Sequence, residues 1–357
     1  MADLGSPPTV VSWKFPRGCR VAFRHAAHWL VAWNVIAGIA ASQSPPAAPT
    51  RPATPAVPPA PEALDLETTD GVKLAVWLYR APDATASATP RPRGAPKPTV
   101  ILVHDLGGTH ASVEPLALAL QRAGCHVVAP DLRGHGDSTV RSGPGGKEVE
   151  VEAKSLKRGD LEAIAASTGG TVRDQANARG DLETVRDFLR MQSGWDAPGL
   201  DRLVVIGIGT GATLATQWTA ADASWPPLAS GPQGRQVKAL VLVSPAWTPR
   251  GLPILPALGQ ETVKRDVPIL VLAGRADKDA LRVFDQLKRG RPQEWYEQRT
   301  GAGPAQAPKL EKPADATAVL LQIDADDSGE KLLASRRPDP AELIKGFLGA
   351  VLPQPRP

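Results

Sequence analysis

From Leu64 onward the chain alternates short continuous apolar runs with segments of helical periodicity. Fully apolar runs of this kind predict strands that are buried on both faces. They occur in "PTVILV", "HVVAP", "RLVVI", "VKALVLV", "VPILVLAG" and "TAVLLQI". Strands of this type separated by helices predict an α/β fold, in which helices cover both faces of a mostly parallel sheet.

Turn and capping residues indicate where several of the predicted strands and helices begin or end. An Asp-Gly turn at Asp70 and Gly71 precedes an alternating strand from Val72 to Tyr79, which predicts an antiparallel hairpin at the start of the domain. Helices are expected up to Gly124, over Asp181 to Met191, and near the C-terminus with Asp339 as N-cap. The stretch from Val140 to Gly180 gives no clear pattern.

The N-terminal part differs in composition from the rest. In residues 1–44, Arg17, Arg20 and Arg24 precede an apolar run. This run is shorter than the roughly 18–20 residues of a membrane span. The pattern predicts an export signal peptide or an N-terminal membrane anchor. Residues 45–63 are rich in proline and predict an extended linker. We therefore expect a periplasmic, extracellular or membrane-anchored protein whose folded domain covers residues 64–353.

Charge and cysteine content narrow the function classes. The chain has 41 basic and 37 acidic residues, a formal net charge of +4, and no basic stripe with interleaved aromatics, so we expect no nucleic-acid partner. Cys19 and Cys125 are its two cysteines, which gives no disulfide framework, and no metal-ligand spacing is present. No cofactor and no metal are predicted.

Several motifs together indicate a family. The segment "LVHDLGGTHASVEPLALALQRAGCHVVAPDLRGHGDS", the strand-turn-helix at Gly207 to Gly211, "VLVSPAW" and "ILVLAGRADKDA" follow one another in order. In this order they resemble the α/β-hydrolase superfamily, in particular its serine aminopeptidase or monoglyceride-lipase-like group. The resemblance spans about Leu66 to Leu352 and implies the α/β-hydrolase fold, with a catalytic triad in the order nucleophile, acid, histidine.

The resemblance also locates the triad, and two of its three members are missing. The family's nucleophile position is Gly209, its acid position is Asp277, and the position of its histidine base is Ser328. All six histidines precede the acid, the last being His135, so no imidazole follows it along the chain. Gly209 has no side chain that could act as a nucleophile, and the hydroxyl of Ser328 cannot act as a general base near neutral pH.

The oxyanion site is altered as well. Backbone N–H groups of Leu106 and Thr210 are expected to form a small anion-binding nest. In "HDLGG", however, Asp105 stands where the family has glycine, and a carboxylate there is expected to repel a developing oxyanion unless it turns away.

Three functions remain open at this stage. The first is a catalytically inactive hydrolase fold that binds a small molecule or protein in the cleft above Gly209. The second is an esterase, lipase or peptidase with unorthodox catalytic residues. The third is a nucleotide-binding protein, because Gly207, Gly209 and Ala212 satisfy G-x-G-x-x-A, although no acidic residue lies between Asp222 and Glu261 to hold a ribose.

Overall fold

The computed structural model describes residues 58–82, 96–165, 180–192, 197–226, 229, 234–300, 315–335 and 338–352. All of these lie within one compact unit, residues 52–357. The predicted signal or anchor, residues 1–44, and most of the predicted linker fall outside the described residues.

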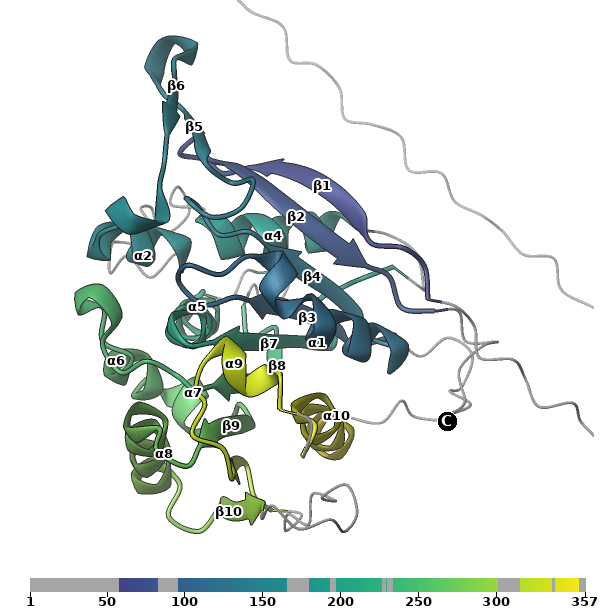
Figure 1. Ribbon diagram of the computed structural model, residues 1–357, viewed down its shortest axis with the longest axis vertical. Helices are drawn as coiled ribbons and strands as arrows, with labels where there is room; N and C mark the ends of the chain where they lie inside the picture. Colours follow the sequence, from purple (N-terminus) through teal and green to yellow (C-terminus); the bar gives the residue numbers. More distant parts are fainter. Residues whose placement is uncertain are drawn as a thin grey trace, which may run out of the picture. The chain divides into compact units, whose positions relative to one another are not determined.

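A nine-stranded sheet forms the centre of the domain, in the order β1-β2-β4-β3-β7-β8-β9-β11-β10 (Figure 1). Strand β2 runs antiparallel to both of its neighbours, and the remaining pairs are parallel. The strands are β1 Glu62–Glu67, β2 Lys73–Tyr79, β3 Thr99–Val103, β4 His126–Pro130, β7 Leu203–Ile208, β8 Val237–Val243, β9 Ile269–Gly274, β10 Trp295–Thr300 and β11 Ala318–Ile323. This is the α/β fold with a mostly parallel sheet that the apolar runs predict.

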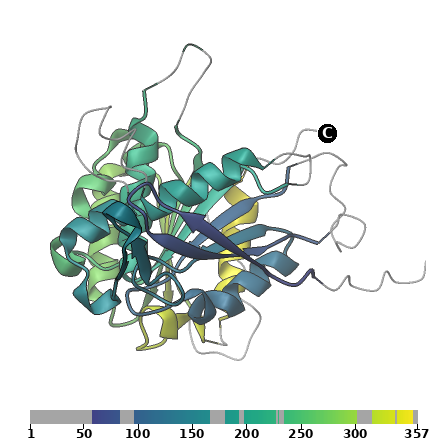
Figure 2. The same ribbon diagram turned by 90° about the horizontal axis from the view of Figure 1, so that it is seen from above.

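Helices cover both faces of the sheet (Figure 2). Helices α1 and α10 pack on one face, and α4, α5, α7 and α8 pack on the other. The helices are α1 His110–Arg122, α2 Arg158–Ile164, α4 Asp181–Met191, α5 Thr210–Ser224, α6 Leu255–Leu258, α7 Glu261–Arg265, α8 Lys278–Gly290, α9 Glu330–Leu333 and α10 Pro340–Val351. Asp339 caps α10 as predicted, because its Oδ1 accepts a hydrogen bond from the Ala341 N–H at 2.9 Å.

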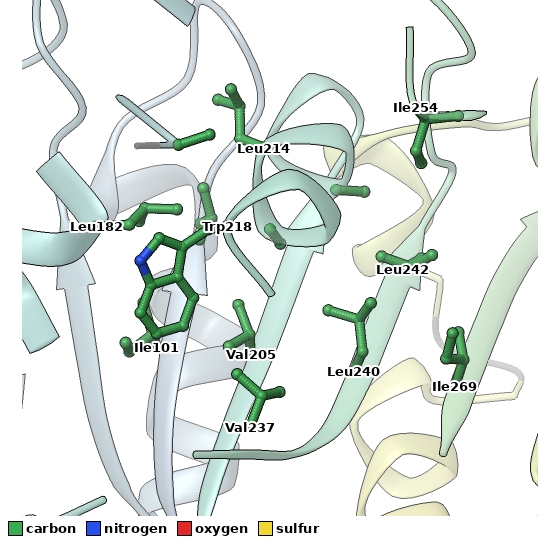
Figure 3. Close-up of a cluster of buried hydrophobic side chains, with 14 of the residues drawn as sticks. Ile101, Leu182, Val205, Leu214, Trp218, Val237, Leu240, Leu242, Ile254 and Ile269 are labelled. Atoms are coloured by element: carbon green, nitrogen blue, oxygen red, sulfur yellow. The ribbon is translucent and has the colours of Figure 1, made fainter. Parts of the chain in front are cut away.

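The alternation of side chains along each strand divides the core into two layers. Ile101 faces α4 and α5, whereas its neighbours Val100 and Leu102 face α1 and α10. Trp218 of α5 is fully buried in the first layer and stands close to Ile101 and Leu182 (Figure 3). Trp218 is therefore a core residue rather than part of an exposed surface.

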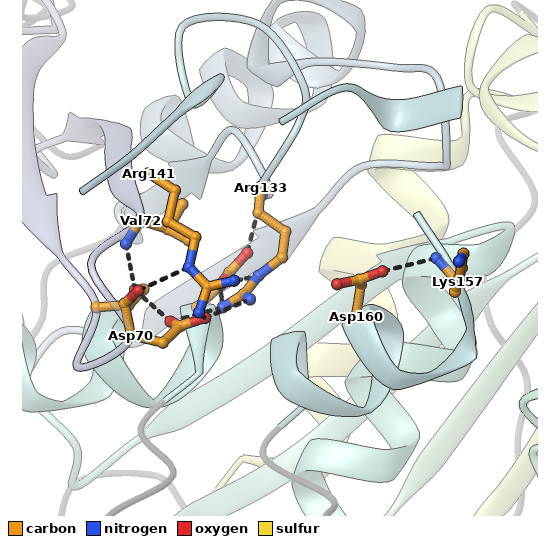
Figure 4. Close-up of polar contacts among 8 residues, drawn as sticks. Asp70, Val72, Arg133, Arg141, Lys157 and Asp160 are labelled. Atoms are coloured by element: carbon orange, nitrogen blue, oxygen red, sulfur yellow. Dashed lines mark hydrogen bonds and ion pairs between the residues drawn. The ribbon is translucent and has the colours of Figure 1, made fainter. Parts of the chain in front are cut away.

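An ion-pair cluster fixes the loop that follows β4 (Figure 4). The Arg133 guanidinium donates hydrogen bonds to Asp181 at 2.7 and 2.9 Å and to Asp70 at 2.9 and 3.2 Å. The backbone N–H of Arg133 also donates to Asp181 Oδ2 at 2.8 Å. The predicted Asp-Gly turn, the loop after β4 and the start of α4 are thus joined through one side chain.

Some elements differ from the sequence prediction. Strand β1 begins at Glu62, so the sheet starts within the predicted linker 45–63. Strand β10 was not predicted, because its sequence "WYEQRT" is polar and lies at the sheet edge, where burial does not impose an apolar run. In the unclear stretch 140–180, the short strands β5 Val140–Ser142 and β6 Glu148–Glu150 pair as a separate hairpin ahead of α2. Within the described part of the chain, no helix has the length and apolar character needed to cross a membrane.

Candidate functional site

The turn between β7 and α5 lies in the middle of the sheet and is built by glycines. A Cβ at Gly207 would lie 2.4 Å from the Gly211 carbonyl oxygen, and a Cβ at Gly211 would lie 2.2 Å from that of His104. Gly209 stands between them with φ 55° and ψ −117°, a conformation that disfavours other residues. The outer glycines let α5 approach β7 and the end of β3 closely. The backbone of a nucleophile elbow is therefore present, and the side chain at its apex is absent.

The carboxylate of Asp105 occupies the space that a side chain at Gly209 would need. A Cβ at Gly209 would lie 2.2 Å from Asp105 Cγ and Oδ2 and 2.4 Å from Oδ1. Distances this short exclude any side chain at position 209 while Asp105 keeps its conformation. The group at the apex of the turn therefore comes from the loop after β3 instead of from the turn itself.

The same carboxylate takes up the predicted anion nest. Asp105 Oδ1 accepts hydrogen bonds from the backbone N–H groups of Leu106 and Thr210, both at 2.7 Å. From the sequence, the Asp105 carboxylate is expected either to repel an oxyanion or to turn away from it. The side chain does turn, but into the nest, where one of its oxygens takes the place of the oxyanion.

Two further contacts hold the Asp105 backbone in position. Its N–H donates to Glu330 Oε1 at 3.1 Å, and its carbonyl accepts a hydrogen bond from His104 Nδ1 at 2.6 Å. Glu330, at the start of α9, also lies 2.8 Å from Ser112 Oγ. The loop after β3 is thus tied to the loop after β11, the segment in which the family carries its base.

The two histidines nearest the site serve the loop architecture. His104 is fully buried and its Nε2 accepts from the Leu132 N–H at 3.0 Å, so its proton is on Nδ1. Burial lowers the pKa of His104 to about 4. His135 is arranged in the same way: its Nε2 accepts from the Gly107 N–H at 2.9 Å, and its Nδ1 lies 3.0 Å from the Arg133 carbonyl. Both imidazoles use their two nitrogens on backbone groups, which leaves neither of them available as a general base.

Asp277 is the N-cap of α8, and its Oδ1 accepts from the Ala280 N–H at 3.0 Å. Its other oxygen, Oδ2, is buried and has no hydrogen-bond partner among the described residues. Ser328 lies in the same cleft as Asp277. Beside it, a Cβ at Gly329 would lie 3.3 Å from Asp105 Oδ2, so position 329 faces the apex group directly. The acid of the predicted triad thus has one oxygen used for capping and one unused.

These residues line a cleft of about 750 Å³ at the carboxyl ends of the parallel strands, where α/β folds bind ligands. Gly209 and Thr210 form part of its wall, and so do Ser244, Asp277 and Ser328. Within the described residues, no group of three or more His, Cys, Asp or Glu side chains is arranged to hold a metal ion. The cleft that was expected above Gly209 is present and can hold a ligand of metabolite size.

The structure argues against the nucleotide alternative. A pyrophosphate bound by G-x-G-x-x-A would rest on the N-terminus of α5. The Thr210 N–H at that N-terminus already donates to the Asp105 carboxylate, whose charge would repel a phosphate.

Comparison with known proteins agrees with this fold. Residues 100–350 match the model of the alpha/beta hydrolase family. The chain belongs to this family. A search of curated proteins found no match.

Solved structures of other proteins align over most of this chain. An esterase from Pyrococcus furiosus is 16% identical, with 82% of this chain and 91% of that one covered and a TM-score of 0.50. A serine hydrolase without a lid from Xanthomonas campestris is 20% identical, with 85% and 100% covered and a TM-score of 0.44. Dienelactone hydrolase from Anabaena variabilis is 16% identical, with 82% and 99% covered and a TM-score of 0.44. At 16% identity the likeness to the esterase shows the fold alone.

Two features of the site were missed from the sequence. One is the position of the Asp105 carboxylate at the apex of the turn. The glycine at position 209 could have indicated it, because the absence of a side chain there leaves room for a side chain from another segment. The other is Glu330, which joins the loop after β11 to the loop after β3. Neither contact follows from local spacing, since the partners are more than 100 residues apart.

Proposed function

We propose that this protein is a non-catalytic member of the alpha/beta hydrolase family that binds a ligand in the cleft above Gly209. The observation that carries the proposal is the position of the Asp105 carboxylate, which takes both the nucleophile's space and the two backbone donors of the oxyanion site. An acyl substrate would have to displace a hydrogen-bonded carboxylate before its carbonyl oxygen met either donor.

The expected loss of activity is large. In working serine hydrolases, removal of a triad member leaves only about 10³- to 10⁴-fold acceleration over water, which comes from binding and the oxyanion donors. In this chain glycine stands at the predicted nucleophile position and serine at the predicted base position, and the N–H groups of Leu106 and Thr210 donate to Asp105 as well. The oxyanion donors, which supply part of the residual acceleration in other hydrolases, are therefore not free to stabilise a transition state here.

Covalent labelling gives a direct test, because a fluorophosphonate probe reacts only with an activated serine. We expect the intact protein to stay unlabelled, with an active serine hydrolase labelled in parallel as control. Rates on an unactivated ester should be near background and equal for the wild type and Asp277→Ala, both shown to be folded by circular dichroism. Labelling, or turnover above roughly 1 s⁻¹ that collapses in Asp277→Ala, would reject the proposal and favour an esterase, lipase or peptidase with unorthodox residues.

We propose further that the domain is exported, or tethered to a membrane by residues 1–44. This rests on the three arginines before a short apolar run and on the proline-rich segment that follows.

A further inference from the structure

The cleft above Gly209 is acidic, although the chain as a whole carries a formal net charge of +4. Five carboxylates and two lysines line it: Asp105, Asp277, Asp279, Asp326 and Glu330, with Lys278 and Lys331. A concave surface lined mainly by one sign of charge concentrates ligands of the opposite sign. The excess of carboxylates therefore favours a cation.

Most of this negative charge meets neutral donors instead of cations. The Asp105 carboxylate accepts from two backbone N–H groups, and Asp279 Oδ2 accepts from the Trp247 N–H at 3.0 Å. In the described part of the chain, Asp326 alone of the five forms an ion pair, with Arg275 at 2.9 Å. Hydrogen bonds from backbone amides leave the net charge of the cleft unchanged, so its field persists.

Two buried polar atoms in the cleft wall have no hydrogen-bond partner in the described part of the chain. Asp277 Oδ2 and Ser244 Oγ are both buried and make no hydrogen bond to any described residue. Ser244 is 7% exposed and lines the cleft at the end of β8. Buried polar atoms in folded proteins are nearly always hydrogen-bonded, so unused atoms in a cleft wall point to a missing ligand donor.

The kind of cation follows from these two observations. The carboxylates are not grouped closely enough to form a metal site among the described residues, which disfavours a divalent ion. An alkylammonium carries three N–H donors on one charged centre and an apolar stem. It offers donors of the kind that Asp277 Oδ2 and Ser244 Oγ lack among the described residues, and its charge is balanced by the surrounding carboxylates.

We infer that the cleft above Gly209 binds a primary organic amine as its alkylammonium ion. The inference rests on the proposed non-catalytic function and names the ligand class for the same site. The ammonium supplies the donor that the family's imidazole would have offered to the acid, and the cleft of about 750 Å³ admits its carbon stem.

Isothermal titration calorimetry of the full chain at low ionic strength tests the inference. The probes are 1,5-diaminopentane, as a free amine, and Nα-acetyl-lysine amide, as the lysyl side chain of a peptide. Neutral 1,5-pentanediol and anionic glutarate serve as matched controls. We expect saturable binding of at least one amine, weakened by added NaCl, and no binding of the diol or glutarate. The stronger of the two amines identifies the source of the ligand.

Three variants locate the binding. Asp277→Asn keeps an acceptor for the α8 cap but turns the unused oxygen into a donor, so amine affinity should fall at least tenfold. Ser244→Ala should lower it several-fold. The matched control is Asp285→Asn, which removes the same charge from the exposed side of α8, where Asp285 pairs with Lys288, and should leave affinity unchanged.

The outcomes separate this inference from the proposed function. Failure of the wild type to bind either amine, equal binding of the diol, or equal weakening by Asp285→Asn would overturn the amine site. If Asp277→Asn does not fold by circular dichroism, Ser244→Ala decides, and unchanged affinity there overturns the site. Fluorophosphonate labelling is measured on the same preparation and bears on catalysis alone.

Discussion

Acidification should destabilise the domain through one buried imidazole, that of His104. Burial lowers the pKa of this side chain from 6.5 to about 4, with the neighbouring His135 and His110 adding to the shift and the Asp105 carbonyl and Asp131 opposing it. In the unfolded chain His104 therefore binds a proton near pH 6.5, whereas in the folded chain it binds one only near pH 4. Stability from this group is fully present above pH 6.5 and is lost as the pH falls through that window.

The magnitude follows from the size of the shift. Each pKa unit corresponds to about 1.4 kcal/mol, so the whole window is worth about 3 kcal/mol, of which about 2 kcal/mol is lost between pH 7 and pH 5. Two buried carboxyls, Glu183 and Asp222, have a pKa raised by burial and contribute the opposite slope. Their contribution is the same in proteins that differ only at His104 and cancels from the comparison.

The assay is urea unfolding of the wild type and His104→Gln at pH 7 and pH 5. Gln cannot titrate, so the variant should lack the loss of about 2 kcal/mol, which corresponds to a midpoint difference of roughly 1 M urea. Val283→Ala, a core truncation on α8, is the control for general destabilisation and should keep the wild-type pH dependence. Equal pH dependence of stability in wild type and His104→Gln would refute the assignment of this loss of stability to His104.

Three further predictions follow from the site, the loop after β4 and the N-terminal segment. Gly209→Ser should destabilise the domain by about 1–3 kcal/mol because of the clash with Asp105, and Asp105→Gly in the same chain should recover most of that loss; additive effects in urea unfolding would contradict the clash. Arg133→Met should cost about 3–5 kcal/mol because it leaves Asp181 buried without a cation, and a change below 1 kcal/mol in the same measurement would argue against this account. Tagged full-length protein should be recovered outside the cytoplasm on cell fractionation, whereas full-length soluble protein in the cytosol would contradict the role proposed for residues 1–44.

Elements buried on both faces were predictable from the sequence, because burial imposes a local pattern. Strands β3, β7, β8, β9 and β11 each coincide with an apolar run, and β7 continues to Ile208, two residues beyond the predicted end. The edge strand β10 carries no such pattern, since one side of it faces solvent and its residues are polar. The stretch 140–180 resists prediction for a similar reason: β5 and β6 form a small exposed hairpin outside the main sheet.

For the site, order along the chain was sufficient to place Gly209 and Asp277 at one cleft. The donors Leu106 and Thr210 were also expected, and both donate to one anionic oxygen. The sequence did not show that this anion is the carboxylate of Asp105. Its position depends on the rotamer of Asp105 and on the space at position 209, and neither follows from the sequence. The assignment of a base position to Ser328 stays a prediction, and Gly329 beside it faces the apex group more directly.

The mutual exclusion between a side chain at 209 and the Asp105 carboxylate also limits the order of mutational change. In this backbone a serine at 209 and an aspartate seated in the nest cannot coexist, since their atoms would lie 2.2 Å apart. A lineage that passes from an active hydrolase to this arrangement must therefore lose the nucleophile before, or together with, the seating of the aspartate. With the aspartate in this position, restoring serine alone is expected to destabilise the protein, so Asp105 has to change before or together with Gly209. Under the proposed non-catalytic function, a return to catalysis requires coordinated changes, and the cleft is free to diverge toward other ligands.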